Sequence, residues 1–109
     1  MSWDFSMYVD VGGDEPGYLG YDANYTYNVA PMFALAFGDE EGIRVLHTKK
    51  GRICRGLLKA AITRMEASPE VYEAMNPESG WGNVEGALDL LYQLLGWCTE
   101  APGALMEIT

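Results

Sequence analysis

Residues 76–98, NPESGWGNVEGALDLLYQLLGWC, predict a turn that leads into the helix around which the remaining chain packs. Apolar residues recur in it at steps of three and four, which is the spacing of one helix face. The predicted core-facing stripe consists of Val84, Ala87, Leu88, Leu91, Leu95 and Cys98. Asn83 is suited to accept the first free backbone N–H groups, and Pro102 follows the helix end. The stretch therefore marks both ends of a buried helix.

Gly80 and Gly82 flank Trp81 directly ahead of this helix. Glycine adopts backbone conformations that other residues avoid, so the pair predicts a tight turn. Such a turn aims the indole of Trp81 either into the core or at a partner, because an indole combines a large apolar body with one polar N–H group. The sequence leaves both orientations open.

Residues 51–66, GRICRGLLKAAITRME, predict a second amphipathic helix. Arg52, Arg55 and Lys59 recur at helical spacing on the side opposite the apolar one, so we expect three cations on one exposed face. The predicted core face consists of Ile53, Leu57, Leu58, Ala61, Ile62 and Met65.

Two shorter helices are also predicted. Residues 29–37 are apolar nearly all round, which favours a largely buried helix with Asn28 as its cap. Residues 69–76 begin with a proline that follows Ser68, an order typical of a capped helix start. The chain thus contains three or four helical segments.

Strands are predicted at both ends of the chain. Residues 3–11, WDFSMYVDV, alternate apolar and polar side chains, which is the period of a half-buried strand. After a turn rich in glycine, residues 18–21 are predicted to return as an antiparallel partner, and residues 104–109 to form a last strand beside the first. We therefore predict a single α+β domain, residues 1–109, in which this small antiparallel sheet packs against the helices.

Residues 43–50 fit either an edge strand or an irregular crossing segment. They contain His47, the only histidine, which has no Ser or Cys beside it in the sequence. A surface or boundary position is favoured for His47 over a catalytic role. Asp10, Asp14 and Glu15 lack the spacing and the closing Glu of an EF-hand. The sequence therefore predicts no metal site, no cofactor and no catalytic residue.

The charged residues fall into three blocks. All seven Lys and Arg lie between residues 44 and 64, where no acid occurs, and eight acids lie on each side, for a net charge of −9. The favoured interpretation is a basic helix partly neutralised by acidic neighbours, because blocks of charge are usually solvated faces. The other is a cationic patch for an anionic ligand, framed by acids that repel long nucleic acids. The net charge disfavours general nucleic-acid binding.

Asn24, Thr26 and Asn28 alternate along the chain. In an extended segment their polar groups would point the same way and offer a row of ligand-binding groups. The same residue types also bond to their own backbone in turns, which is the favoured interpretation.

The location of the protein is predicted from what the sequence lacks. No apolar run reaches the roughly 20 residues that cross a bilayer, and the first residues carry no basic lead of a secretion signal. We therefore expect a cytoplasmic protein without membrane contact. Cys54 and Cys98 lie on different predicted helices and can meet in the core, where a reducing compartment would keep them as thiols and export would permit a disulfide.

Two motifs carry a family resemblance. They are Asn24-x-Thr26-x-Asn28, and Asn76-Pro77-x-x-Gly80-Trp81-Gly82-x-x-x-Gly86-x-Leu88. From residue 22 onwards the chain resembles a family of short, uncharacterised proteins abundant in phages, especially those of actinobacteria. That family has His in place of Tyr27, Asn in place of Ser79 and an aromatic residue in place of Val84. The resemblance implies a phage accessory protein acting inside a bacterium, and it carries over no activity.

Three function classes remain. The first is a non-catalytic module that binds a host protein or a small anionic ligand, and self-association would help it to form a pocket. The second is an acidic inhibitor that imitates nucleic acid and blocks a host enzyme. The third, rated lowest, is a small enzyme built around His47 or Asp22, because no phosphate-binding loop or nucleophile elbow is present. The candidate contact residues are Asn24, Thr26, Asn28, Asn76, Trp81, Arg52, Arg55 and Lys59.

Overall fold

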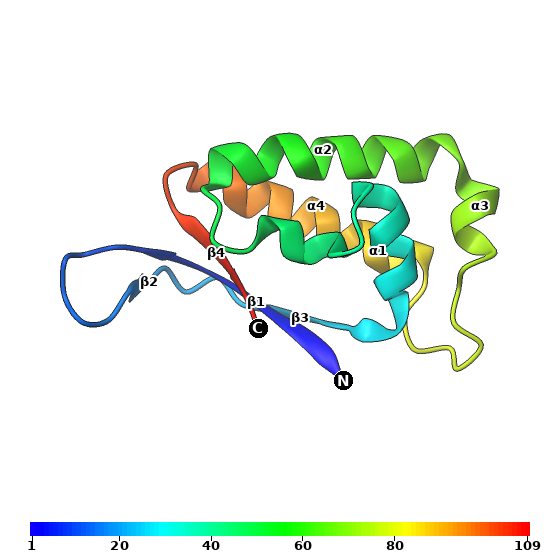
Figure 1. The fold of residues 1–109 in the computed structure, drawn as a ribbon, viewed down its shortest axis with the longest axis horizontal. Helices are drawn as coiled ribbons and strands as arrows, with labels where there is room; N and C mark the ends of the chain where they lie inside the picture. Colours follow the sequence, from blue (N-terminus) through cyan, green and yellow to red (C-terminus); the bar gives the residue numbers. More distant parts are fainter.

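The computed structural model describes all 109 residues and shows a small antiparallel sheet with the helices on one side of it (Figure 1). This confirms the predicted α+β fold. In chain order the elements are β1 (Ser2–Val9), β2 (Gly17–Tyr18), β3 (Ala23–Thr26), the 3₁₀ helix η1 (Tyr27–Val29), α1 (Ala30–Phe37), the 3₁₀ helix η2 (Gly42–Leu46), α2 (Gly51–Ala67), α3 (Pro69–Glu73), α4 (Val84–Glu100) and β4 (Leu105–Ile108).

The first strand, β1, is the centre of the four-stranded sheet; its alternating sequence predicted the strand but not its central place. It pairs along one edge with β2 and β3 and along the other with β4, always antiparallel. Trp3, Phe5 and Met7 are buried on its helix side. The predicted return strand, β2, is only two residues long. The polar residues Asn24 and Thr26 were expected to form a turn, but they lie in the strand β3.

The outer edge of β4 is covered by the segment between η2 and α2. The backbone N–H of Thr48 donates to the carbonyl of Met106 at 2.7 Å, and the N–H of Met106 donates to the carbonyl of Lys49 at 3.0 Å. Nδ1 of half-buried His47 accepts the backbone N–H of Ile108 at 3.0 Å. Residues 43–50 are therefore an irregular crossing segment with a 3₁₀ turn, and the edge-strand alternative is wrong.

The second helix, α2, spans almost the predicted residues, and four of the six predicted core residues are buried, namely Leu58, Ala61, Ile62 and Met65. The other two are not. Ile53 is 52% exposed and Leu57 is only half-buried, whereas Cys54 is fully buried. Both the predicted and the observed row have helical spacing, and contact with α4 selects the one that contains Gly51 and Cys54. The buried side of α2 consists of Gly51, Cys54, Leu58, Ala61, Ile62 and Met65.

The last helix, α4, begins as predicted but is rotated. The side chain of Asn83 accepts the N–H of Gly86 at 2.7 Å and caps the helix. Val84, Leu88 and Leu95, expected in the core, are only half-buried. This helix has apolar residues on more than one side, so packing decided which were covered. The buried residues are Ala87, Leu90, Leu91, Leu94, Trp97 and Cys98.

Of the two predicted caps, Asn28 is wrong, and Ser68 is confirmed in position but not as a side-chain cap. The turn η1 precedes α1 and moves the start of that helix beyond Asn28, whose own N–H donates to the hydroxyl of Thr26 at 3.2 Å. Ser68 stands at the start of α3, but its side chain makes no capping hydrogen bond. Helix α1 is also less buried than expected, because Leu35 is 47% exposed.

Cys54 and Cys98 are buried free thiols on α2 and α4, as expected for two cysteines that meet in the core. A hydrogen bond with Cys98 and burial raise the pKa of the Cys54 thiol above its ordinary value. The Cys54 thiol therefore stays protonated and packs as a small apolar group in the helix contact. None of the helices is long and apolar enough to span a membrane.

Candidate functional site

The polar row of β3 lies on the face of the sheet that turns away from the helices. Asn24 pairs with Asp4, and Thr26 pairs with Ser2, while their neighbours pair with buried residues of β1. The side-chain amide of Asn24 donates to Ser2 Oγ at 3.0 Å, to the carbonyl of Trp3 at 3.1 Å and to Asp4 Oδ1 at 2.8 Å. Asn24 therefore joins β3 to β1 and has few hydrogen-bonding groups left for a ligand.

Asn28 joins this row to the turn around Trp81. Its amide donates to Ser79 Oγ and to the carbonyl of Trp81, both at 3.4 Å. The two glycines beside Trp81 have φ angles of +78° and +89°, which confirms the tight turn. That turn leaves the Trp81 indole 72% exposed, so the inward orientation is wrong.

The structure brings four of the five candidate contact residues outside α2 to one shallow cleft. The cleft measures about 400 Å³ and is lined by Met1, Ser2, Asn24, Thr26, Asn28 and Trp81. Asn76 does not line it, because its Oδ1 accepts the backbone N–H of Val84 at 2.9 Å and helps to begin α4. The amide side chains thus connect strands and turns by hydrogen bonds. Trp81 is the residue of this cleft whose side chain remains open to a partner.

The three candidate cations share one flank of α2, beside α4, and are not opposite the core as predicted. Arg52 and Lys59 are exposed and Arg55 is half-buried. The guanidinium of Arg52 lies near Gly103, just after α4, and Arg55 is close enough to α4 for its charge to act on the Cys98 thiol. The cations lie on this flank because the buried side of α2 is rotated from the predicted one.

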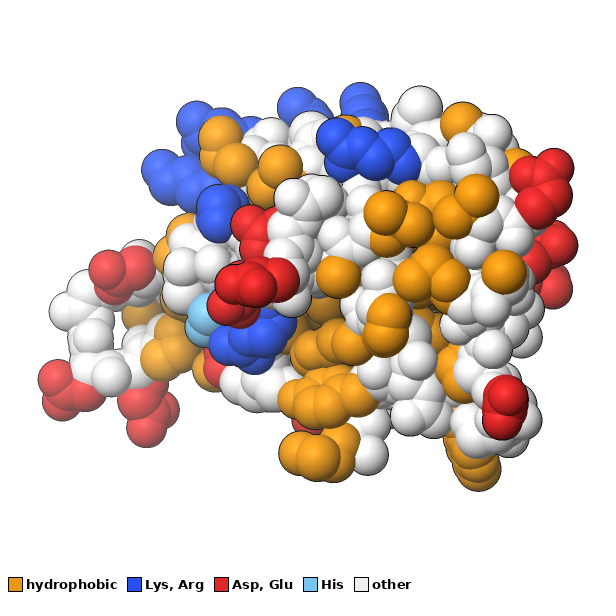
Figure 2. Space-filling view, turned by 45° about the vertical axis from the view of Figure 1, so that its right-hand side comes forward, with side chains coloured by type: hydrophobic (Ala, Val, Ile, Leu, Met, Phe, Trp, Pro, Cys, Tyr) orange, Lys and Arg blue, Asp and Glu red, His pale blue; other side chains and the backbone are white.

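Not all of the other basic residues lie on this flank, because Arg44 lines a hollow together with Glu40 and Glu41. Figure 2 shows most of the Lys and Arg side chains in view along the edge formed by α2, with Asp and Glu side chains toward both ends and in the middle of the face. Arg44 and Arg64 donate to backbone carbonyls, at 3.0 Å and 2.7 Å, and Lys49 donates to the carbonyl of Val45. These three side chains are therefore held in place by backbone acceptors.

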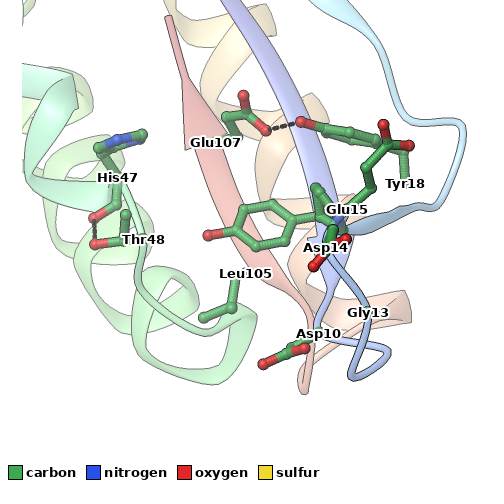
Figure 3. Close-up of a pocket in the computed structure, with 11 residues that line it drawn as sticks. Asp10, Gly13, Asp14, Glu15, Tyr18, His47, Thr48, Leu105 and Glu107 are labelled. Atoms are coloured by element: carbon green, nitrogen blue, oxygen red, sulfur yellow. Dashed lines mark hydrogen bonds between the residues drawn. The ribbon is translucent and has the colours of Figure 1, made fainter.

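A hollow between the β1–β2 turn and the crossing segment was not predicted (Figure 3). It measures about 520 Å³. Asp10, Asp14 and Glu15 come from the turn, Glu107 from β4, and His47 from the segment before α2. In the sequence, only the acidic turn could have indicated this hollow, because its other walls are formed by residues far along the chain. No group of three or more His, Cys, Asp or Glu side chains is placed to hold a metal ion.

Three tyrosine hydroxyls donate to carboxylates and connect elements that are distant in sequence. Tyr18 donates to Glu107 at 2.6 Å, Tyr21 to Glu100 at 3.0 Å, and Tyr92 to Glu66 at 2.8 Å. In each case the hydrogen bond to the carboxylate is the largest cause that raises the tyrosine pKa above 10.0, and burial adds to it.

We predict that Glu107→Gln lowers the pKa of Tyr18 toward 10.0, because the acceptor loses its charge. A tyrosine whose pKa is higher in the folded than in the unfolded state contributes stability that is complete below the unfolded pKa of about 10 and is lost as pH rises through the folded pKa. NMR titration of labelled tyrosine rings measures the shift. Glu73→Gln, whose carboxylate is not among the groups that shift the pKa of Tyr18, is the control. An unchanged Tyr18 titration in Glu107→Gln would contradict the assignment.

No protein-family model, curated protein or solved structure matches this chain. The resemblance to phage proteins, carried by the two motifs, stays a prediction.

Proposed function

We propose that the protein is a non-catalytic binding module that engages an anionic partner protein through the basic edge, defined here as Arg52, Arg55 and Lys59 on α2. The observation that carries this proposal is the grouping of Arg52, Arg55 and Lys59 on one flank of α2, within a stretch from residue 44 to residue 64 that holds all seven Lys and Arg and no acid. Arg52 and Lys59 are exposed on that flank. Isolated surface cations are commonplace, but an unbroken block of one sign creates a field that steers a partner of opposite charge.

A partner protein is favoured over a small anionic ligand. Small ligands are bound in concave sites that cover most of their surface. None of the five hollows in the structure is lined by Arg52, Arg55 or Lys59. These cations lie on a convex helix flank, which suits a second macromolecular surface, and the net charge of −9 opposes a nucleic acid.

Trp81 is a second candidate contact. Its indole is 72% exposed at the corner held by Asn28, and exposed tryptophans frequently supply much of the binding energy of an interface. The phage resemblance would place the partner in the cytoplasm of the bacterial host. The acidic-mimic alternative has less support, because Glu66, Glu100 and Glu107 already accept tyrosine hydroxyls.

We expect the double variant Arg52→Gln/Lys59→Gln to lose binding partners. Tagged wild-type and variant proteins would be purified from bacterial cytoplasm, and the co-purifying proteins would be compared by quantitative mass spectrometry. Loss of two exposed charge contacts should lower retention of acidic partners roughly fivefold to thirtyfold, corresponding to about 1–2 kcal/mol. Raised salt should have the same effect on the wild type.

The control Gln93→Glu/Thr109→Glu makes the same change in net charge at two exposed positions away from the basic edge. It should retain the wild-type partners. Equal retention by the wild type and Arg52→Gln/Lys59→Gln, or equal loss in both double variants, would refute the proposal.

A further inference from the structure

A groove lies where α1, the end of α2 and α3 meet. It measures about 370 Å³ and is lined by Leu35, Arg64, Ala67, Ser68, Val71 and Tyr72. Among the hollows of this molecule it is the one with a mostly apolar lining. Figure 2 shows hydrophobic side chains gathered below the edge formed by α2. The groove lies at the C-terminal end of α2, and the basic edge begins near the N-terminal end of the same helix.

Two large apolar side chains stand open in this groove. Leu35 is 47% exposed and Val71 is 49% exposed, although the residue after each of them in its helix is buried. Tyr72, at 3% exposure, is held firmly in the core. Exposed apolar side chains grouped around a concavity are typical of a contact surface. The volume is suited to one large side chain and not to a whole helix.

Arg64 is the only charged residue that lines the groove. Its guanidinium donates to the carbonyl of Ala36 at 2.7 Å, which fixes the cation at the rim. Glu70 and Glu73 are exposed on α3 but do not line the groove. A peptide segment that places a carboxylate next to an apolar side chain would therefore meet complementary charge and complementary apolar surface.

We infer that the groove binds one large apolar side chain, such as Leu or Phe, from an acidic segment of the partner protein. This inference rests on the proposed function, because the cations of α2 would bind acids of the same segment. A second copy of the chain fits less well, since a two-fold contact through this groove brings the two Arg64 rims together. The groove would supply the specificity that a charge contact alone lacks.

A displayed library of short random peptides tests the inference without a known partner. Selection on the immobilised wild type should enrich acidic peptides that contain at least one Leu, Phe, Met or Trp. A synthetic copy of an enriched peptide should bind about tenfold more weakly to Leu35→Ser/Val71→Ser, as expected when an apolar anchor loses its pocket. The same loss should follow replacement of the peptide's apolar residue by Ser.

Ile53→Ser is the matched control, because Ile53 is 52% exposed on α2 outside the groove. It should bind the peptide within about twofold of the wild type. Circular dichroism of each variant verifies that it is folded. Peptides that bind Leu35→Ser/Val71→Ser as well as the wild type but weaken on Arg52→Gln/Lys59→Gln would refute the groove and leave the proposed function intact. Absence of enriched peptides, enrichment of basic ones, or a dimer lost in Leu35→Ser/Val71→Ser would also overturn the inference.

Discussion

Replacement of Phe33 by alanine is expected to destabilise the fold by about 3–5 kcal/mol. Phe33 is fully buried on α1, and its ring centroid lies 5.6 Å from that of Trp3 on β1 and 6.2 Å from that of Phe37. It therefore joins the sheet to the helices. The cavity left by alanine removes apolar contacts that the surrounding helices cannot close in to replace. A domain of this size is stable by only about 5–15 kcal/mol, so much of the margin would be lost.

Urea denaturation followed by circular dichroism measures this change in the free energy of unfolding. Leu35→Ala is the control, two residues away on the same helix, and its side chain is 47% exposed. We expect that control to cost less than about 1 kcal/mol, because only part of the side chain leaves the protein. Similar losses in the two variants would mean that α1 does not present Phe33 to the core as described.

The long elements were predictable because their sequence period is strong and their ends carry local signals. Residues 51–66 and the helix after Asn83 differ from α2 and α4 by only a few terminal residues. The first strand was predictable for the same reason, since Trp3, Phe5 and Met7 alternate with polar residues. Asn83 needed only its own helix to form the cap, so no distant contact had to be known.

The orientation of the helices was not predictable, because it depends on which surfaces meet. Ile53 is more hydrophobic than Cys54, and the sequence pattern favoured it, yet the contact with α4 covers Cys54 and leaves Ile53 exposed. The flank occupied by Arg52, Arg55 and Lys59 moved with that rotation. The cap assigned to Asn28 failed for a related reason, since η1 intervenes before α1 and the Asn28 amide has partners in the loop around Trp81.

The candidate site was predicted in parts. For Asn24, Thr26 and Asn28 the favoured interpretation was a turn, whereas Asn24 and Thr26 lie in β3 and all three line one cleft, as the extended alternative implied. The glycines beside Trp81 correctly indicated a turn. Nothing local indicated that Asn28 and Trp81 would meet across more than fifty positions, at an amide-to-carbonyl distance of 3.4 Å. Likewise, the groove at Leu35 and Val71 needs α1 and α3 side by side, which only the tertiary arrangement provides.

Gly51→Ala is expected to destabilise the fold by about 1–3 kcal/mol, whereas the same change at Gly56 should stabilise it by about 0.5–1 kcal/mol. A Cβ on Gly51 would lie 2.6 Å from the carbonyl oxygen of Ala101 and 3.3 Å from the Cα of Cys98. These are backbone atoms, so neither can rotate aside, and α2 would have to move away from the end of α4. A Cβ on Gly56 would meet no heavy atom within 4 Å.

Gly51 is the first residue of α2 and Gly56 lies inside the helix, so alanine gains helix propensity chiefly at Gly56, and the contact with α4 decides the sign of the change at Gly51. A loss of stability at Gly51 would therefore report the closeness of α2 to α4, the contact that buries Cys54 and turns Arg52 and Lys59 to the outside. Thermal unfolding should place the midpoint of Gly51→Ala below that of the wild type and the midpoint of Gly56→Ala above it. If both variants were stabilised, α2 and α4 would have room between them. Their close contact would then not explain why α2 is rotated so that the basic edge is exposed.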